Sequence, residues 1–125
     1  MKFKITKSTI ILVLICYVVL LTVLSLVNFP EDRKTIDIEN LDKVKHIIFY
    51  FGLNSLLLIM VHLYSRSAKM WQIICVTLST IIYGFIIEII QQNIGREFDM
   101  GDIVANVVGV ALSLVIYYLI TPKNK

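Results

Sequence analysis

The sequence predicts an all-α fold, an integral membrane bundle of four transmembrane helices. Hydrophobic residues make up 58% of the 125 residues and charged residues only 17%, which is too apolar for a soluble domain of this size. The apolar residues gather in four runs, each close to the ~20 residues that a helix needs to cross a ~30 Å hydrocarbon core. The runs are residues 9–29, 47–64, 71–94 and 103–120.

The first run follows three lysines, as a secretory signal does. It exceeds the usual ~7–15-residue apolar region and lacks a small-residue cleavage site after it, so we expect it to remain as a signal anchor. The longest polar stretch, residues 30–43, is too short to build a second core. We therefore expect one domain over residues 1–125. Cys16 and Cys75 lie at different depths and match no metal-ligand spacing, which predicts two unpaired, buried thiols.

The basic residues favour an orientation with both termini in the cytoplasm. This orientation places seven of the twelve inside, namely Lys2, Lys4, Lys7, Arg66, Lys69, Lys123 and Lys125. The other five fall outside, namely Arg33, Lys34, Lys43, Lys45 and Arg96. Lysine and arginine are enriched in cytoplasmic segments. The small positive charge suits anionic membrane lipids as partners, and nothing in the sequence indicates binding to nucleic acid.

Polar residues recur at steps of three and four along the last three apolar segments, so each predicted helix has one polar face. These faces carry Asp42, His46 and Tyr50 on the second helix, Thr77, Thr80, Gly84, Glu88 and Gln91 on the third, and Asp102, Asn106, Gly109 and Ser113 on the fourth. The predicted topology brings their charged ends to the same membrane surface. We therefore expect an acidic pocket at the outer leaflet, walled by three helices, with Arg96 on its rim.

Ionisable residues at membrane depth indicate a functional site by default, but structural roles also fit several of them. Asp42 favours a helix N-terminus, and His46 could be an interfacial imidazole bonded to it. Asp99 and Asp102 lie where the fourth helix needs a cap. Arg96 could be an interfacial residue that snorkels to the headgroups, or the counter-ion of Glu88, a pairing that would make both residues structural.

Three motifs follow one another along the chain, namely Asp42-Lys43-x-x-His46-x-x-x-Tyr50, Glu88-x-x-Gln91 and Gly95-Arg96-x-Phe98-Asp99-x-x-Asp102-x-x-x-Asn106-x-x-Gly109. By their order and spacing the chain resembles the VanZ-like membrane family. The first helix is similar only in hydropathy. The resemblance carries over eight site residues, namely Asp42, His46, Glu88, Gln91, Arg96, Asp99, Asp102 and Asn106. It implies a multi-pass protein of the bacterial cytoplasmic membrane, with tolerance to teicoplanin-type glycopeptides as an associated phenotype.

Three classes of function remain open. The first is an envelope protein whose outer pocket binds a lipid-linked cell-wall precursor, a phospholipid headgroup or a lipoglycopeptide. The second is an intramembrane enzyme acting on a lipid-linked substrate, with His46, Glu88 and Asp102 as the catalytic candidates and a divalent metal as a cofactor that the carboxylates could hold. The third is a structural or transport subunit in which the polar residues only join helices.

Overall fold

The computed structural model describes residues 6–27, 38–65 and 68–121. Within these residues the chain forms four helices and no strands. The helices are α1 (Lys7–Leu26), α2 (Ile38–Ser65), α3 (Met70–Asn93) and α4 (Met100–Ile120). Each is long and apolar enough to cross a membrane, by length and composition. The predicted fold class, an all-α bundle of four membrane-spanning helices, is therefore confirmed.

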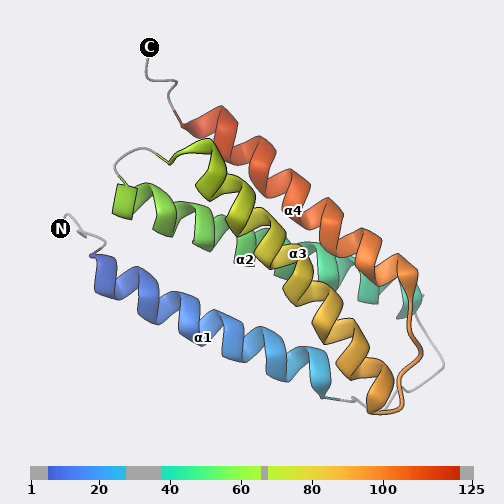
Figure 1. Cartoon of the computed structure of the whole chain (residues 1–125). Coiled ribbons are helices and arrows are strands. Elements are labelled where there is room, and N and C mark those ends of the chain that lie inside the picture. The colour runs from blue at the N-terminus through green and yellow to red at the C-terminus, as the bar shows by residue number, and fades with distance from the viewer. Residues whose placement is uncertain (1–5, 28–37, 66–67, 122–125) are drawn as a thin grey trace.

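Successive helices run in opposite directions along the bundle (Figure 1). α1 begins and α4 ends at one end of the bundle. α2 and α4 begin, and α3 ends, at the opposite end. The polar faces predicted from the sequence therefore bring their charged residues to the same end, the one remote from the start of α1.

The apolar run predicted over residues 47–64 is only part of α2. The helix begins at Ile38, so Asp42 and His46 lie within it, as their shared helical face predicted. At ~1.5 Å per residue its 28 residues span ~42 Å, more than a ~30 Å hydrocarbon core, so one end extends into the headgroup region. Hydropathy detects only the apolar part of such a helix. An ion pair between Asp42 and Lys45, three residues apart, supports the polar part.

α2 contacts the other three helices and packs most closely against α4. Gly109 permits this approach, because a Cβ atom at that position would overlap the backbone carbonyl oxygen of Ile47 and lie 2.9 Å from the backbone nitrogen of Phe51. Small residues allow helix backbones to approach closely in membranes, where apolar burial gives little driving force. The glycine expected on the polar face of the fourth helix therefore sets the spacing between α2 and α4.

A buried polar network joins three helices midway along the bundle. Asn54 of α2 donates to the hydroxyl of Ser113 of α4 at 2.6 Å, and Thr80 of α3 donates to the Asn54 side-chain oxygen at 3.1 Å. Such interhelical hydrogen bonds contribute roughly 1 kcal/mol each. They fix the rotation of α2, α3 and α4 about their axes, and so decide which residues face one another at the polar end.

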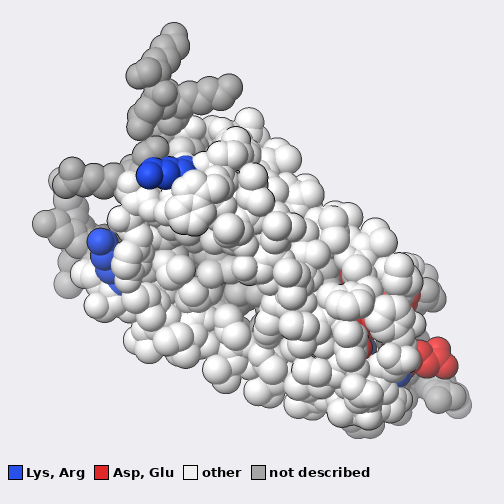
Figure 2. Space-filling view, in the orientation of Figure 1, with Lys and Arg blue, Asp and Glu red and all other residues white. Residues whose placement is uncertain are grey.

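The outer surface of the bundle is apolar, as a bilayer requires. Figure 2 shows a broad uncharged band between basic residues at one end and acidic residues at the other. Large apolar side chains of the helices, such as Leu12, Ile82 and Val104, are exposed. Cys16 and Cys75 are free, as expected, but both are exposed; the expectation of buried thiols was wrong, because a lipid-facing position suits a small apolar residue equally well.

Candidate functional site

The eight predicted site residues gather at the end of the bundle where α2 and α4 begin. We call them the polar cluster: Asp42, His46, Glu88, Gln91, Arg96, Asp99, Asp102 and Asn106. Four of their side chains are almost fully buried, namely those of His46, Glu88, Gln91 and Asn106, and Asp102 is 5% exposed. The helix geometry that placed these residues on inward faces was therefore predicted correctly.

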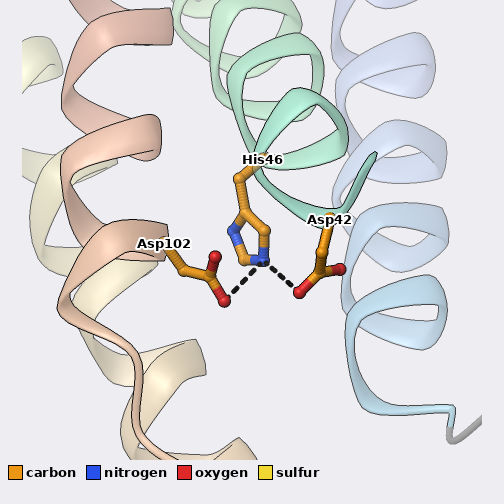
Figure 3. Close-up of side chains that lie close together, drawn as sticks. All are labelled: Asp42, His46 and Asp102. Carbon is orange, nitrogen blue, oxygen red and sulfur yellow. Dashed lines mark ion pairs between the residues drawn. The ribbon is translucent and has the colours of Figure 1, made fainter. Parts of the chain in front are cut away.

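His46 lies at the centre of the polar cluster. Its Nδ1 atom is 2.8 Å from the side-chain oxygen of Asn106, and because that oxygen only accepts hydrogen bonds, Nδ1 carries the proton. Its Nε2 atom faces Oδ2 of Asp102 at 3.6 Å and Oδ2 of Asp42 at 4.0 Å (Figure 3). His46 is only 2% exposed. The imidazole therefore lies inside the bundle and not on its outer surface.

Arg96 is turned back over the polar cluster by the end of α3. Gly95 has a φ of 92°, a left-handed conformation that glycine adopts without a Cβ penalty. The N–H of Gly95 donates to the Gln92 carbonyl at 3.3 Å, and the N–H of Arg96 donates to the Gln91 carbonyl at 3.1 Å. This pair of bonds is a Schellman motif, the common glycine-dependent helix end. The motif explains why glycine immediately precedes Arg96 in the sequence.

Arg96 forms its ion pair with Asp42, and not with Glu88, the counter-ion considered from the sequence. Its guanidinium Nη2 donates to Oδ2 of Asp42 at 3.2 Å, whereas Glu88 was the expected counter-ion. Glu88 instead accepts a hydrogen bond from the backbone N–H of Asp99 at 3.0 Å. The pairing depends on how far α2 and α3 are offset along their axes, which the sequence does not reveal.

α1 contributes a group that sequence reasoning missed. The backbone carbonyl of Ser25 accepts hydrogen bonds from the Gln91 side chain at 2.7 Å and from Nη1 of Arg96 at 3.2 Å. Ser25 is in the last turn of α1, where carbonyl groups have no partner within the helix. Every residue carries such a carbonyl, so no residue type could have indicated this one. The only signal in the sequence was a small polar residue near the end of an apolar helix, and the structure shows that this side chain is 1% exposed.

Asp99 is the N-cap of α4. The sequence had offered Asp99 and Asp102 as candidates for this cap. Oδ1 of Asp99 accepts from the N–H of Gly101 at 2.7 Å, and its Oδ2 is 3.3 Å from Nζ of Lys43. The Gly101 hydrogen bond, followed by the Lys43 contact, lowers the pKa of Asp99 below its ordinary value. Asp102, in the first turn of α4, does not cap the helix but points to His46.

Tyr50 and Gly84 extend the cluster toward the middle of the bundle. The Tyr50 ring is fully buried and lies parallel to the His46 ring, with centroids 6.3 Å apart. A Cβ atom at Gly84 would lie 2.8 Å from Tyr50 and 2.9 Å from the Asn106 side-chain nitrogen. Tyr50 was identified on the polar face of the second helix but not as a site residue. Together these residues hold His46 and Asn106 in register.

Several buried polar atoms of the polar cluster have no hydrogen-bond partner. In the part of the chain that the structure describes, they include His46 Nε2, Glu88 Oε2, Gln91 Oε1, Asp102 Oδ1 and Asn106 Nδ2. A buried polar atom without a partner costs roughly 1–3 kcal/mol, and most buried polar atoms in proteins are paired. A cluster that only joined helices would gain stability by pairing these atoms. Their concentration at one end favours a site that receives a further group.

A separate apolar cavity lies between α1, α2 and α3. Its volume is about 270 Å³, and its lining includes Leu14, Leu53 and Tyr83. None of the residues of the polar cluster lines this cavity. The bundle thus has a polar cluster at one end and an apolar cavity between its apolar helix segments.

The polar cluster offers two kinds of chemistry. Asp42, His46 and Asp102 each offer a ligand atom, and these atoms lie within 4.8 Å of one another, so they could hold a metal ion. The His46 imidazole, positioned by Asn106 and facing two carboxylates, could also transfer a proton.

Comparison with known proteins gives one match. The family model described as VanZ/LLP1 matches residues 9–121, nearly the whole chain, including the first helix. No curated protein and no solved structure matches this chain.

Proposed function

The chain belongs to the VanZ/LLP1 family, and on that premise we propose that it is a multi-pass protein of the bacterial cytoplasmic membrane whose polar cluster binds the headgroup of a lipid-linked or lipophilic ligand. In this proposal both termini are cytoplasmic and the polar cluster faces the outer leaflet. The excess of basic residues on the proposed cytoplasmic side supports this orientation.

One observation carries the proposal: buried, unpartnered polar atoms converge from α2, α3 and α4 at one end of the bundle. They include acceptors, at Glu88 and Asp102, and a donor, at Asn106 Nδ2. A polar headgroup offers hydroxyl and amide donors to such carboxylates and phosphate oxygens to such a donor. Mixed donors and acceptors in a buried site are typical of the few polar groups that orient a ligand.

The rim of the polar cluster supports an anionic component in the headgroup. Lys43, Lys45 and Arg96 are partly exposed there, with 29%, 33% and 26% of their side-chain surface accessible. Each contacts an aspartate, which weakens its attraction for a further anion, but a guanidinium has five N–H donors and Arg96 makes two bonds within the described part of the chain, so it can also donate to a phosphate. The apolar cavity between α1, α2 and α3 provides space for part of a lipid chain.

Glycopeptide tolerance would follow from such binding. A protein that holds a lipid-linked cell-wall precursor, or the lipid tail of a teicoplanin-type lipoglycopeptide, changes how often antibiotic and target meet at the outer leaflet. Tolerance is then a consequence of ligand binding and requires no modification of the drug.

An intramembrane enzyme acting on a lipid-linked substrate is the second candidate. The observation in its favour is the placement of His46 between Asn106 and two carboxylates, since an imidazole held in one tautomer can act as a general acid or base. A structural or transport subunit is the third candidate. The retained-lipid experiment described next distinguishes it from the other two.

The test is to extract the full-length protein from its own membrane into lipid-preserving polymer particles and to identify the retained lipids by mass spectrometry. We expect one class of lipid with a phosphorylated headgroup to be enriched over bulk membrane. Glu88→Gln and Asp102→Asn should reduce this enrichment at least tenfold without lowering protein yield. Glu97→Gln, an exposed carboxylate at the same end, is the matched control.

Identical lipid content in wild type, Glu88→Gln and Asp102→Asn would contradict headgroup binding. It would favour the third candidate, a structural or transport subunit. Incubating the purified protein with the enriched lipid tests the second candidate. Conversion of that lipid by wild type but not by His46→Gln would establish an enzyme, with His62→Gln, at the opposite end of α2, as control.

A further inference from the structure

We infer that Asp42, His46 and Asp102 form a binding site for a divalent transition-metal cation of the zinc type. Nε2 of His46 and one carboxylate oxygen from each aspartate are the ligands, and all three atoms lie within 4.8 Å of one another. Figure 3 shows the imidazole pointing between the two carboxylates, with Asp42 and His46 on α2 and Asp102 on α4. The site thus joins the two most closely packed helices.

The protonation of His46 is the first argument. Nδ1 donates its proton to the Asn106 side-chain oxygen, so in the neutral imidazole Nε2 carries a lone pair. This lone pair faces two carboxylates, at 3.6 Å and 4.0 Å. Neutral Nε2 and the two carboxylate oxygens repel one another. The Arg96 guanidinium offsets the charge of the Asp42 oxygen, and a cation bound among the three atoms would offset the rest.

The distances are the second argument. Hydrogen bonds of this kind have donor–acceptor separations of about 2.7–3.2 Å, and both contacts of Nε2 are longer. Zinc binds nitrogen and oxygen ligands at about 2.0–2.2 Å, so two ligands of a tetrahedral ion lie about 3.3–3.6 Å apart. The contact of Nε2 with Asp102 falls in this range. The contact with Asp42 exceeds it, and the two carboxylate oxygens lie within 4.8 Å of each other, so Asp42, the more exposed of the two aspartates, has to move inward to bind the ion.

Burial without a partner is the third, independent observation. The His46 side chain is 2% exposed, and its Nε2 atom has no hydrogen-bond partner among the described residues. Oδ1 of Asp102 is likewise buried and without a partner. Asn106 supplies the hydrogen bond to the second ring nitrogen that orients most metal-binding histidines. The trio therefore has the supporting contacts of a metal site as well as its ligands.

The donor set decides the class of ion. Calcium and magnesium prefer oxygen ligands alone, whereas imidazole with carboxylates suits zinc, manganese or iron(II). Three protein ligands leave at least one position for water or a ligand oxygen. This site lies inside the polar cluster, but the inference does not depend on the proposed lipid ligand, because the ion is held by protein groups alone.

The experiment measures binding of the metal alone. Full-length protein with its affinity tag removed, carrying Cys16→Ala and Cys75→Ala to eliminate the exposed thiols, is stripped with chelator and placed in nanodiscs of zwitterionic lipid. Zn²⁺ is titrated by calorimetry, and Co²⁺ by its visible absorption, which reports nitrogen and oxygen coordination. We expect one ion per protein. His46→Gln and Asp102→Asn should weaken binding at least tenfold, and Asn106→Ala about 10–100-fold.

The controls are His62→Gln and Glu97→Gln, a histidine and a carboxylate outside the trio, which should bind as the parent protein does. Circular dichroism measures the helix content of each variant and so identifies any that fails to fold. If the His46 or Asp102 variant fails to fold, Asp42→Asn is tested in its place, because Asp42 is the more exposed of the two aspartates. Failure of the parent protein to bind one ion, or equal binding by the His46 and Asp102 variants, would overturn the inference. The retained-lipid measurement uses no added metal, so either proposal can fail while the other stands.

Discussion

The guanidinium of Arg96 donates to the carboxylate of Asp42 across 3.2 Å, although 54 positions separate the two residues in sequence. The same guanidinium donates to the Ser25 carbonyl at the end of α1. Arg96 thereby connects the turn after α3 to both α1 and α2. This contact closes the polar end of the bundle over His46.

Replacing Arg96 by Gln should lower the free energy of unfolding by about 1.5–3 kcal/mol, the usual range for hydrogen bonds to a charged group. In a double-mutant cycle with Asp42→Asn, we expect a coupling energy of about 0.5–3 kcal/mol, measured by denaturant unfolding in detergent. Arg96→Lys should recover only part of the loss, because lysine cannot donate to both partners in one plane. Strictly additive effects of the two substitutions would show that the pair makes no net contribution.

Glu88 allows structural and ligand-binding roles to be separated. Glu88→Gln keeps an oxygen that can accept from the Asp99 N–H, so the free energy of unfolding should remain within about 1 kcal/mol of wild type. Glu88→Leu removes that acceptor and should cost about 1–3 kcal/mol. Both should lose the bound headgroup. If Glu88→Gln destabilised the protein as much as Glu88→Leu, the charge of Glu88 would be structural.

Gly109 tests the close contact between α2 and α4. Gly109→Ala places a methyl group against the backbone of Ile47 and Phe51, which cannot move as a flexible side chain would. We expect a loss of about 1–3 kcal/mol in the free energy of unfolding, as for other overpacked sites. Val108→Ala, at the neighbouring lipid-facing position, is the control and should change stability little. Equal stability of both variants would mean that the helices can separate without cost.

Asp99 should contribute to stability in a pH-dependent manner. Its pKa in the folded protein lies below its ordinary value of 3.8, because the Gly101 N–H and Lys43 stabilise the carboxylate. A lowered pKa stabilises the fold above the ordinary value, and this contribution is lost as the pH falls through the folded-state pKa. Asp99→Asn still caps α4, so it should differ from wild type less at about pH 3 than at about pH 6 in thermal unfolding. A constant difference across this range would contradict the assignment.

The proposed orientation predicts how the two ends of the bundle react in intact cells. Lys69, which precedes α3, and Glu97, which follows it, are both exposed and lie at opposite ends. In a background lacking Cys16 and Cys75, Glu97→Cys should react with a membrane-impermeant thiol reagent and Lys69→Cys should react only after lysis. Labelling of Lys69→Cys alone would invert the topology and place the polar cluster at the cytoplasmic surface.

The sequence by itself determined the number of membrane spans, the all-α class and the residues that face inward. These properties are local, because apolar runs give the spans and steps of three and four give the faces, as Glu88, Gln91 and Asn106 show. Only the tertiary structure decided the partners: Asp42 rather than Glu88 for Arg96, Asn106 for His46, and the Ser25 carbonyl for Gln91. Partner choice depends on the rotation and axial offset of whole helices. Those are set by the approach of α2 to α4 at Gly109 and by the Asn54 network, which hydropathy does not record.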